Sequence, residues 1–472
     1  MSNSTRSLNL EDIVSPQEVI HPALDWVKGQ LIVGVQLKDG QRAVLSSKHG
    51  LTNAEEVGVV CEQGRNFEGV VSLDVAREIT DFLKLPAKSR PSANGMSVIK
   101  SLAAYFKRFV TFSHSWWPDV LACWTLGTYL YPIFQTYPYL RITSPQPGCG
   151  KSQLGGIIAA LSFNGELMVS PSEAQLFRLP EITRGVQVWD EVETSGYVDQ
   201  KRFATIQPVL LNGYRIGGSV PRQVGKGYEK SARFHVYCPR VFIGLSALPE
   251  AASQRTIKVY LQKRGSSEKI EHYQTADHVD EERRIRDCCL IWAIKSADLV
   301  RTEYSGPSLR EYTEKRLGPG RICDDVWLPI LSIASAIQSQ HGITRGKLMQ
   351  SLETASSELA QQVETGPQHH QTCSATSVSP QHQASRAALQ VLKWRNPIEP
   401  TALAAHVSKS VGFDVTSQML SKELAQIGIR AKKVKGRRVF QPTKEEVSAC
   451  ETLLGAEQNG QQGHHEENSH PY

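Results

Sequence analysis

The sequence predicts an α/β fold, and three observations support that prediction. Between residues 141 and 264, short apolar runs alternate with helical patterns, which is typical of a sheet covered on its faces by helices. A glycine-rich segment with a lysine directly follows the predicted strand 139–143. An acidic pair, Asp190 and Glu191, follows another apolar run further along the chain. Both polar features therefore stand at strand ends.

The composition is that of a globular protein. Of the 472 residues, 40% are hydrophobic and 21% are charged, so most of the chain can bury a core and wholesale disorder is excluded. The 53 Lys and Arg against 47 Asp and Glu give a net charge of +6, which is too mild to imply a nucleic-acid partner by itself. At roughly 150 residues per domain, the length predicts about three units.

The cysteines and the apolar runs indicate the cellular compartment in which we expect the protein. Nine cysteines are scattered without a CxxC pair, and the chain starts without a positively charged apolar leader, so we expect no zinc site, no secreted disulfide framework and a cytoplasmic protein. The uncharged run 120–134 is interrupted by Pro132 and is shorter than the roughly 20 residues that a membrane span needs. We expect a buried helix there and no membrane partner.

Changes in composition divide the chain into predicted segments. The stretch 361–385 is polar and biased to Pro, Ser and Gln, so it cannot bury enough surface to offset its ordering entropy. The predicted segments are a small α+β unit (1–95), the α/β core with its preceding helices (96–270), a helical subdomain (271–360), a flexible linker (361–385), a basic domain (386–455) and a disordered tail (456–472).

The glycine-rich segment SPQPGCGKSQL, residues 144–154, follows a predicted strand and opens a predicted helix, which is the context of a P-loop. Its small residues let backbone N–H groups turn toward phosphate oxygens, and the helix N-terminus adds its dipole. We expect Lys151 to reach the β- and γ-phosphates of ATP and Ser152 to offer its hydroxyl to Mg²⁺.

Pro145 stands where the motif has its first glycine and donates no N–H, so the start of the loop must differ. The predicted nucleotide-binding residues are Pro147, Gly148, Cys149, Gly150, Lys151, Ser152 and Gln153. The alternative is a glycine-rich turn that happens to contain a lysine.

The acidic pair supplies the second half of a phosphoryl-transfer site. In GVQVWDEVE, residues 185–193, apolar residues run up to the two carboxylates. Asp190 at the strand end is predicted to hold Mg²⁺ through its water shell, and Glu191 to orient and deprotonate the attacking water. An Asp-Glu pair alone is usually a solvated turn, but its place after a strand and a P-loop favours catalysis.

A third apolar strand, 240–245, ends in Ser246, and Arg255 follows nine residues later. Ser246 is predicted to sense the γ-phosphate, with a strand-terminal cap as the alternative. Arg255 is predicted to be a catalytic finger or sensor that stabilises transition-state charge at a neighbouring subunit's nucleotide. The alternative for Arg255 is a surface salt bridge.

The segment 219–238 holds two alternating apolar runs around Gly225-Lys226-Gly227, which predicts a β-hairpin. Its positive charge, including Arg222 and Lys226, suits a hairpin that projects into a ring pore and grips DNA phosphates without reading sequence. The alternative is a solvated hairpin whose lysines merely protect an edge strand.

Several segments together resemble a known family. They are PYLRITSPQPGCGKSQL, EAQLFRLPE, VWDEVE, VLLNGYRIGGSVPR, QRTIKVYLQKR and RICDDVWLPILSIA. Residues 97–340 are thereby similar to the P-loop ATPase family of phage, plasmid and integrative-element replication proteins. The resemblance implies a ring-forming, AAA-like motor in DNA replication of a mobile element, with Lys151, Ser152, Asp190 and Glu191 on its nucleotide motifs. Gln254 departs from the family, whose members commonly carry Asp before the arginine.

Positive charge is concentrated near the C-terminus. Residues 386–445 hold twelve Lys and Arg against four Asp and Glu. Helical stretches at 400–407 and 416–426, followed by two alternating strands within 429–441, have the order of a winged helix. The predicted DNA contacts of this winged-helix-like domain are Lys422, Lys432, Lys433, Lys435, Arg437 and Arg438. The alternative is a wing that carries only solvated charge.

We therefore expect a nucleic-acid-dependent ATPase that is a DNA helicase or a replication-initiation motor of a mobile genetic element. Single-stranded or forked DNA is the expected partner, and the expected assembly is a homo-oligomeric ring, with a hexamer as one option. Two alternatives stay open: an ATP-switched DNA-binding regulator, and an ATP-dependent recruiter or remodeller without unwinding activity.

Overall fold

The computed structural model describes most of the chain up to residue 364 and parts of the C-terminal region. The described residues are 18–21, 23–37, 42–57, 59–61, 71–91, 93–144, 148–169, 171–190, 200–224, 230–244, 250–261, 270–343, 346–364, 388, 391–392, 398–411, 416–426, 429, 431–434, 437–440 and 442. The chain divides into two compact units, Met1–Gly366 and Pro367–Tyr472.

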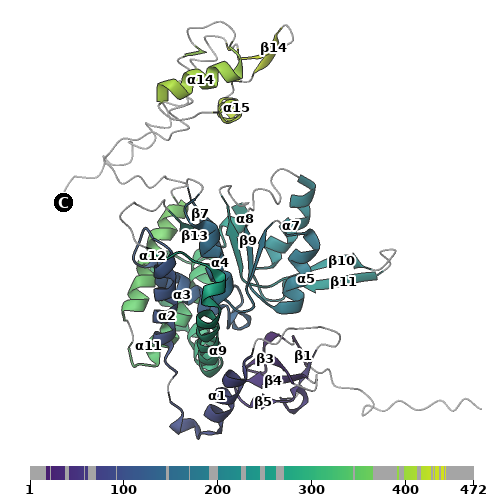
Figure 1. Cartoon of the computed structure of the whole chain (residues 1–472), viewed down its shortest axis with the longest axis vertical. Coiled ribbons are helices and arrows are strands. Elements are labelled where there is room, and N and C mark those ends of the chain that lie inside the picture. Colours follow the sequence, from purple (N-terminus) through teal and green to yellow (C-terminus); the bar gives the residue numbers. More distant parts are fainter. Residues whose placement is uncertain are drawn as a thin grey trace, which may run out of the picture. The chain divides into compact units, whose positions relative to one another are not determined.

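A parallel five-stranded sheet forms the centre of the first unit (Figure 1), which confirms the α/β prediction. Its strand order is β13-β7-β12-β9-β8. The strands are β7 (Tyr139–Thr143), β8 (Glu166–Val169), β9 (Gln187–Asp190), β12 (Arg240–Ile243) and β13 (Thr256–Tyr260). Strands β8 and β9 follow each other in sequence and pair, whereas β7 and β8 lie apart, because β12 and β9 stand between them.

Helices cover both faces of this sheet, because its strands alternate apolar side chains between two clusters. On β7, Leu140 and Ile142 belong to the cluster that includes α4 (Lys151–Leu161), whereas Tyr139 belongs to the opposite cluster. That opposite cluster contains residues of α5 (Glu173–Thr183) and α7 (Gln200–Asn212). A period of two is what a sheet buried on both sides requires.

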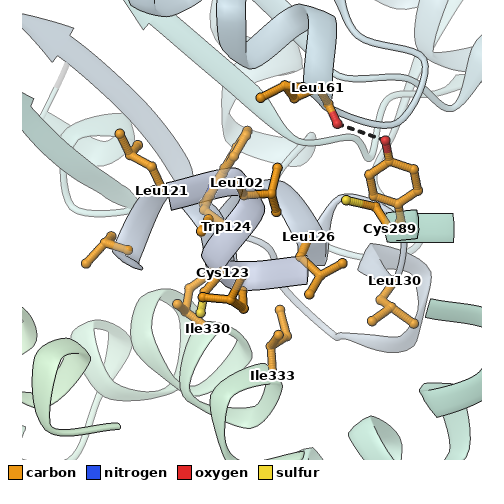
Figure 2. Packing of buried hydrophobic residues seen from close by; sticks show 14 of the residues in the cluster. Leu102, Leu121, Cys123, Trp124, Leu126, Leu130, Leu161, Cys289, Ile330 and Ile333 are labelled. Atoms are coloured by element: carbon orange, nitrogen blue, oxygen red, sulfur yellow. Dashed lines mark hydrogen bonds between the residues drawn. The ribbon is translucent and has the colours of Figure 1, made fainter. Parts of the chain in front are cut away.

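A layer of helices completes the core on the α4 side. These helices are α2 (Gly95–Phe109), α3 (Trp117–Gly127), α9 (Thr275–Ser305), α10 (Pro307–Leu317), α11 (Leu328–Ser339) and α12 (Lys347–Glu364). Figure 2 shows Trp124 and Leu126 of α3 near Leu102 of α2 and Ile333 of α11. The Tyr129 hydroxyl donates to the Leu161 carbonyl over 2.8 Å, which ties this layer to the end of α4.

The uncharged run 120–134 is buried, as predicted. It forms most of α3 and then, past Gly127, the short 3₁₀ turn Tyr131–Ile133, where Pro132 prevents a continuing helix. Within the part of the chain that the structure describes, no helix combines the length and apolar character needed to cross a membrane.

The N-terminal region has an antiparallel sheet of β2 to β5, a separate parallel pair of β1 and β6, and one α-helix. It contains β1 (Glu18–Ile20), β2 (Leu24–Val27), β3 (Gln30–Gln36), β4 (Arg42–Ser46), β5 (Gly50–Thr52), β6 (Val59–Cys61) and α1 (Leu73–Lys84). It packs directly on the central region: Lys295 of α9 pairs with Glu78 of α1 at 2.8 Å, and Ser72 donates to Asp287 over 3.2 Å. One set of its buried residues, including Leu31 and Ile79, shares a hydrophobic cluster with α2 and α3, and Ile32, Val44 and Val57 form a separate one.

The root of the predicted hairpin also lies in the first unit. The strands β10 (Ser219–Val224) and β11 (Lys230–His235) pair antiparallel and extend outward beyond α5 (Figure 1). Beyond β12 come the short helix α8 (Glu250–Ser253) and then β13. A hairpin in this segment is therefore confirmed.

The second unit has the predicted order of two helices and a hairpin. These are α14 (Pro400–Val411), α15 (Ser417–Gln426), β14 (Lys432–Val434) and β15 (Arg437–Val439), with β14 and β15 antiparallel. Leu403, Val407, Leu420 and Leu424 are among the buried residues of its small core. The Ile398 N–H donates to the Phe440 carbonyl over 3.1 Å, which joins the segment before α14 to the end of β15.

Candidate functional site

The sheet brings the glycine-rich loop and the acidic strand end to one edge. Because all five strands are parallel, the residues that follow β7 and the last residue of β9 lie at the same, carboxyl edge. Asp190 ends β9, and Ser144 directly follows β7. With β12 between them and neighbouring strands about 4.8 Å apart, the ends of β7 and β9 are separated by about 10 Å.

Two glycines shape the loop that precedes α4. Gly148 has φ 77° and Gly150 has φ 81°, a left-handed conformation that glycine adopts without strain. A Cβ added at either position would meet no atom within 4 Å among the described residues, so the backbone conformation and not crowding requires glycine. The same open space gives a ligand access to this backbone.

The N-terminus of α4 supplies hydrogen-bond donors to that space. The first intrahelical bond runs from the Leu154 N–H to the Gly150 carbonyl over 2.9 Å. Helix geometry leaves the N–H groups of the preceding residues, Lys151 to Gln153, without an acceptor inside the helix. A helix N-terminus of this kind favours an anion.

Lys151 begins α4 and lies beside the end of β7. Its Nζ donates to Ser144 Oγ over 2.7 Å, and Ser144 is only 4% exposed. Ser152 is exposed and Cys149 is half-buried. The structure therefore brings together Ser144, Lys151 and the glycine loop, and sequence reasoning assigned no role to Ser144.

The side chain of Gln153 binds α2, while its backbone N–H is one of the donors at the start of α4. Its Nε2 donates to the Phe109 carbonyl over 2.8 Å, at the last residue of α2. That amide holds α4 against α2 and does not face the loop. The physical reason is spacing: residue 153 is the third residue of the helix, so its side chain points away from the side that Lys151 occupies.

Arg255 lies far from the glycine loop of its own chain, and its role at a neighbouring subunit's nucleotide stays a prediction. It directly precedes β13, and Thr256 pairs with Tyr139 at the start of β7, so Arg255 lies at the amino edge. About five residues at 3.3 Å each separate that edge from the glycine loop, or roughly 16 Å. Arg255 is 8% exposed, with its guanidinium 4.2 Å from the centre of the Tyr214 ring. Arg255 is therefore not a surface residue in an exposed salt bridge, and it does not lie near the glycine loop of its own chain. To reach a neighbouring subunit, its side chain must leave Tyr214.

Arg222 of the hairpin packs against the body of the protein. Its guanidinium lies 5.2 Å from the Phe177 ring of α5, and its Nη1 donates to the Pro221 carbonyl over 3.0 Å. This partly buried position anchors the hairpin root. Arg233, across from Pro221 in the register, is exposed.

Several predicted site residues lie outside the described part of the chain. Among the nucleotide and catalytic predictions these are Pro147, Glu191 and Ser246, and among the DNA contacts they are Lys226 and Lys435. The side chains of Lys422, Lys433, Arg437 and Arg438 also lie outside it. Lys432, at the start of β14, is described and exposed.

At the amino edge, the structure reveals a buried arginine that sequence reasoning did not assign. Arg240 is 0% exposed, and its guanidinium donates to Gln187 Oε1 over 2.8 Å and to the Val236 carbonyl over 2.9 Å. It also reaches the Gly213 carbonyl and the Tyr139 hydroxyl, each at 3.3 Å. In the sequence, the one feature that could have indicated this buried side chain is an arginine at the start of the apolar run RVFIGL.

A second unassigned network lies beside α4. Glu282 is 3% exposed and accepts hydrogen bonds from the Tyr105 and Tyr273 hydroxyls, each over 2.8 Å. Burial, with help from Glu282, raises the pKa of Tyr273 to about 12. The Tyr273 ring lies against Gly156 of α4, since a Cβ there would approach it to 4.0 Å. This network holds the segment before α9 against the helix that begins at Lys151.

The donor set at the carboxyl edge fits a magnesium nucleotide better than a metal held by protein alone. No group of three or more His, Cys, Asp or Glu side chains among the described residues could hold a metal ion. Mg²⁺ does not need one, because it is usually bound through one or two carboxylates, substrate phosphates and water. A hydroxyl at Ser152 and a carboxylate at Asp190, beside an open anion-binding loop, are donors of that type.

Comparisons with known proteins do not assign the chain to a family. No protein-family model matches the chain, and no curated protein matches it. Solved structures that match include the A-form apo structure of the NrS-1 C-terminal region, with 10% identity, 87% of this chain and 95% of that chain covered, and a TM-score of 0.29. A TM-score that low does not establish a shared fold.

Proposed function

We propose that this chain is an ATP hydrolase whose turnover depends on nucleic acid, and specifically a DNA helicase or replication-initiation motor of a mobile genetic element. The observation that carries the proposal is one arrangement: a glycine loop, Lys151 at a helix N-terminus and Asp190 on one edge of a parallel sheet. The resemblance of residues 97–340 to P-loop replication ATPases supports the same activity.

In this proposal, each part of the loop has a distinct task. Gly148 and Gly150 let the backbone N–H groups face the phosphates, and the N-terminus of α4 favours their negative charge. Lys151 balances the charge that develops on the transferred phosphoryl group. Positioning and charge stabilisation of this kind account for most of the catalysis in phosphoryl transfer.

Asp190 and Ser152 are the proposed magnesium ligands. Mg²⁺ held by these two residues would neutralise negative charge on the phosphates. Asp190 ends β9 half-buried beside Trp189, so the strand fixes its carboxylate at the edge of the sheet. Glu191, the next residue, is the proposed base for the attacking water.

The DNA contact in this proposal comes from two basic parts. One is the hairpin β10–β11, which extends from the body and exposes Arg233. The other is the second unit, where β14 and β15 carry Lys432, Lys433, Arg437 and Arg438. Charge on strands and turns of this kind binds phosphates without reading base sequence.

Steady-state ATPase assays with and without single-stranded DNA test the proposal. We expect ATP hydrolysis that rises when DNA is added, together with strand displacement on a forked duplex. Hydrolysis that ignores DNA in correctly assembled protein would reject the motor. Tight ATP binding without turnover would favour the switched regulator, and DNA-stimulated turnover without strand displacement would favour the recruiter.

A further inference from the structure

A polar cleft of about 460 Å³ lies at the root of the hairpin β10–β11. Its walls come from three segments outside the central sheet: residues 135–136, the turn 212–219 between α7 and β10, and Asp325. The turn is fixed in place, because the Ile216 N–H donates to the Gln135 carbonyl over 2.9 Å. A preformed cleft of this size is in the range of sites that bind small molecules.

The cleft contains opposite charges that do not pair with each other. Arg215 of the turn is exposed, and its guanidinium forms no hydrogen bond or ion pair with any residue that the structure describes. A different segment supplies Asp325, which is half-buried, and the polar side chains of Asn212 and Ser219 also line the cleft. A matching ligand has negative charge at one end and hydrogen-bond donors at the other. A nucleotide has both, in its phosphate and in the N–H groups of its base.

The exposed face of the hairpin leads into this cleft. Ser219, which lines the cleft, pairs with His235, and Pro221 pairs with Arg233 two residues further out. Because side chains alternate along a strand, these four lie on one face of the hairpin, and the side chains of His235 and Arg233 are exposed there. The opposite face, which includes Val220, is part of a buried cluster. A phosphate backbone that follows the exposed face is thus brought to the cleft.

We propose that this cleft is a binding site for one nucleotide of single-stranded DNA, in which Arg215 contacts the phosphate and Asp325 accepts hydrogen bonds from the base. A base can enter the cleft only when it is unstacked, which costs least in a single strand. The inference rests on the proposed DNA contact of the hairpin, and it adds a site that the charges on the hairpin do not include.

DNA binding at several salt concentrations tests the phosphate contact. The probe is a fluorescent single-stranded oligonucleotide of mixed sequence, bound to the full chain without ATP. Each phosphate contact on a single strand adds about 0.7 to the slope of log Kobs against log salt, so Arg215→Ala should lower the magnitude of that slope by about 0.7. Arg215→Glu adds repulsion and should weaken binding further. Arg284→Ala and Arg284→Glu are the matched controls, because Arg284 is an exposed arginine of α9, and both should keep the wild-type slope.

Photocrosslinking tests whether a base enters the cleft. An oligonucleotide that contains 4-thiothymine reacts through its base when it is irradiated on the full chain. After digestion with trypsin, which cuts at Arg202, Arg215 and Arg222, mass spectrometry should find crosslinks in the peptides 203–215 and 216–222. These crosslinks should be lost in Arg215→Glu and kept in Arg284→Glu. Thermal unfolding confirms that each variant is folded at the temperature of the assays.

Two results would overturn the site: Arg215 variants that keep the wild-type salt slope, or wild-type crosslinks that lie only in other peptides. Either result, in protein that binds the oligonucleotide, would reject the cleft while the proposed DNA contact stands, and a protein partner would then be the better occupant. Wild-type protein that binds no oligonucleotide would reject the cleft and the proposed DNA contact together. Because the assays contain no ATP, absence of ATP turnover does not affect their outcome.

Discussion

The two edges of the central sheet use their polar residues in opposite ways. At the carboxyl edge, the glycine loop leaves open space around Gly148 and Gly150, and Lys151 and Asp190 stand at element ends. At the amino edge, Arg240 is fully enclosed by acceptors from four different segments, and Arg255 packs on Tyr214.

This difference predicts that ligand binding and stability depend on opposite edges of one sheet. Ligands of open α/β sheets bind outside the carboxyl ends of the strands, where loops can present backbone donors. A buried polar network that is fully hydrogen-bonded instead makes the packing specific, and losing one partner is costly. Substitutions at the two edges should therefore change different measured quantities.

The largest expected effect comes from Lys151→Ala. Removing this charge should lower kcat for ATP by about 10²- to 10³-fold, the usual cost of one transition-state stabilising group. The temperature of unfolding should stay near that of wild type, because Lys151 is only half-buried. A variant that keeps its ATPase activity, or loses it only by unfolding, would contradict the proposal that ATP is hydrolysed at the carboxyl edge.

Arg240→Leu tests the opposite edge. It removes a buried donor from Gln187 Oε1 and from the Val236 and Gly213 carbonyls, of which Gly213 keeps the Cys238 N–H, so we expect a loss of about 3 kcal/mol in the free energy of unfolding. Urea denaturation measures it. The matched control is Arg283→Leu, an exposed arginine with one surface ion pair, for which we expect a change of less than about 1 kcal/mol. Equal effects of the two substitutions would contradict the buried network.

Arg255→Met sharpens the comparison. Loss of the cation–π contact with Tyr214 should cost about 1–2 kcal/mol of stability. If Arg255 leaves Tyr214 to reach a neighbouring subunit, kcat should also fall by about 10³-fold or more in the assembled protein. A stability loss with unchanged kcat would show that Arg255 only stabilises the amino edge and does not act at a neighbouring subunit.

Asp325→Asn gives the smallest effect, and it depends on pH. Burial raises the pKa of Asp325 above its ordinary value of 3.8, although Thr136 and Arg255 oppose the rise. The folded state therefore binds this proton more tightly than the unfolded state, so stability falls as pH rises from 3.8 through the raised pKa. The free energy of unfolding of Asp325→Asn minus that of wild type should therefore rise as pH increases across this window, as urea denaturation at several pH values would measure. A difference that falls with pH would contradict the assigned direction.

Much of the fold followed from local sequence pattern. The strand before the glycine loop, the strand that ends at Asp190, the hairpin around residue 225 and the helix-helix-hairpin order of the second unit lie where alternation and glycine placement predict them. These signals are local, because they depend on residues within one or two turns or pleats of each other.

Side-chain roles were harder to predict. Gln153 stands inside a recognisable motif, yet the structure uses it to bind the end of α2. Arg255 follows a predicted pattern but is covered by Tyr214, which is 41 residues away in sequence. Arg240 is buried by partners from four distant segments that no pattern around it predicts. Each of these outcomes depends on contacts between distant segments.

The sequence by itself determined that glycines, a lysine and a helix start are contiguous, which is the pattern that predicts a phosphate-binding loop. Only the tertiary structure decided that Asp190 faces that loop across β12, and that two arginines lie at the opposite edge. The physical reason is that parallel strands pair with partners far away in the chain, so strand order and edge placement follow from packing of the whole sheet.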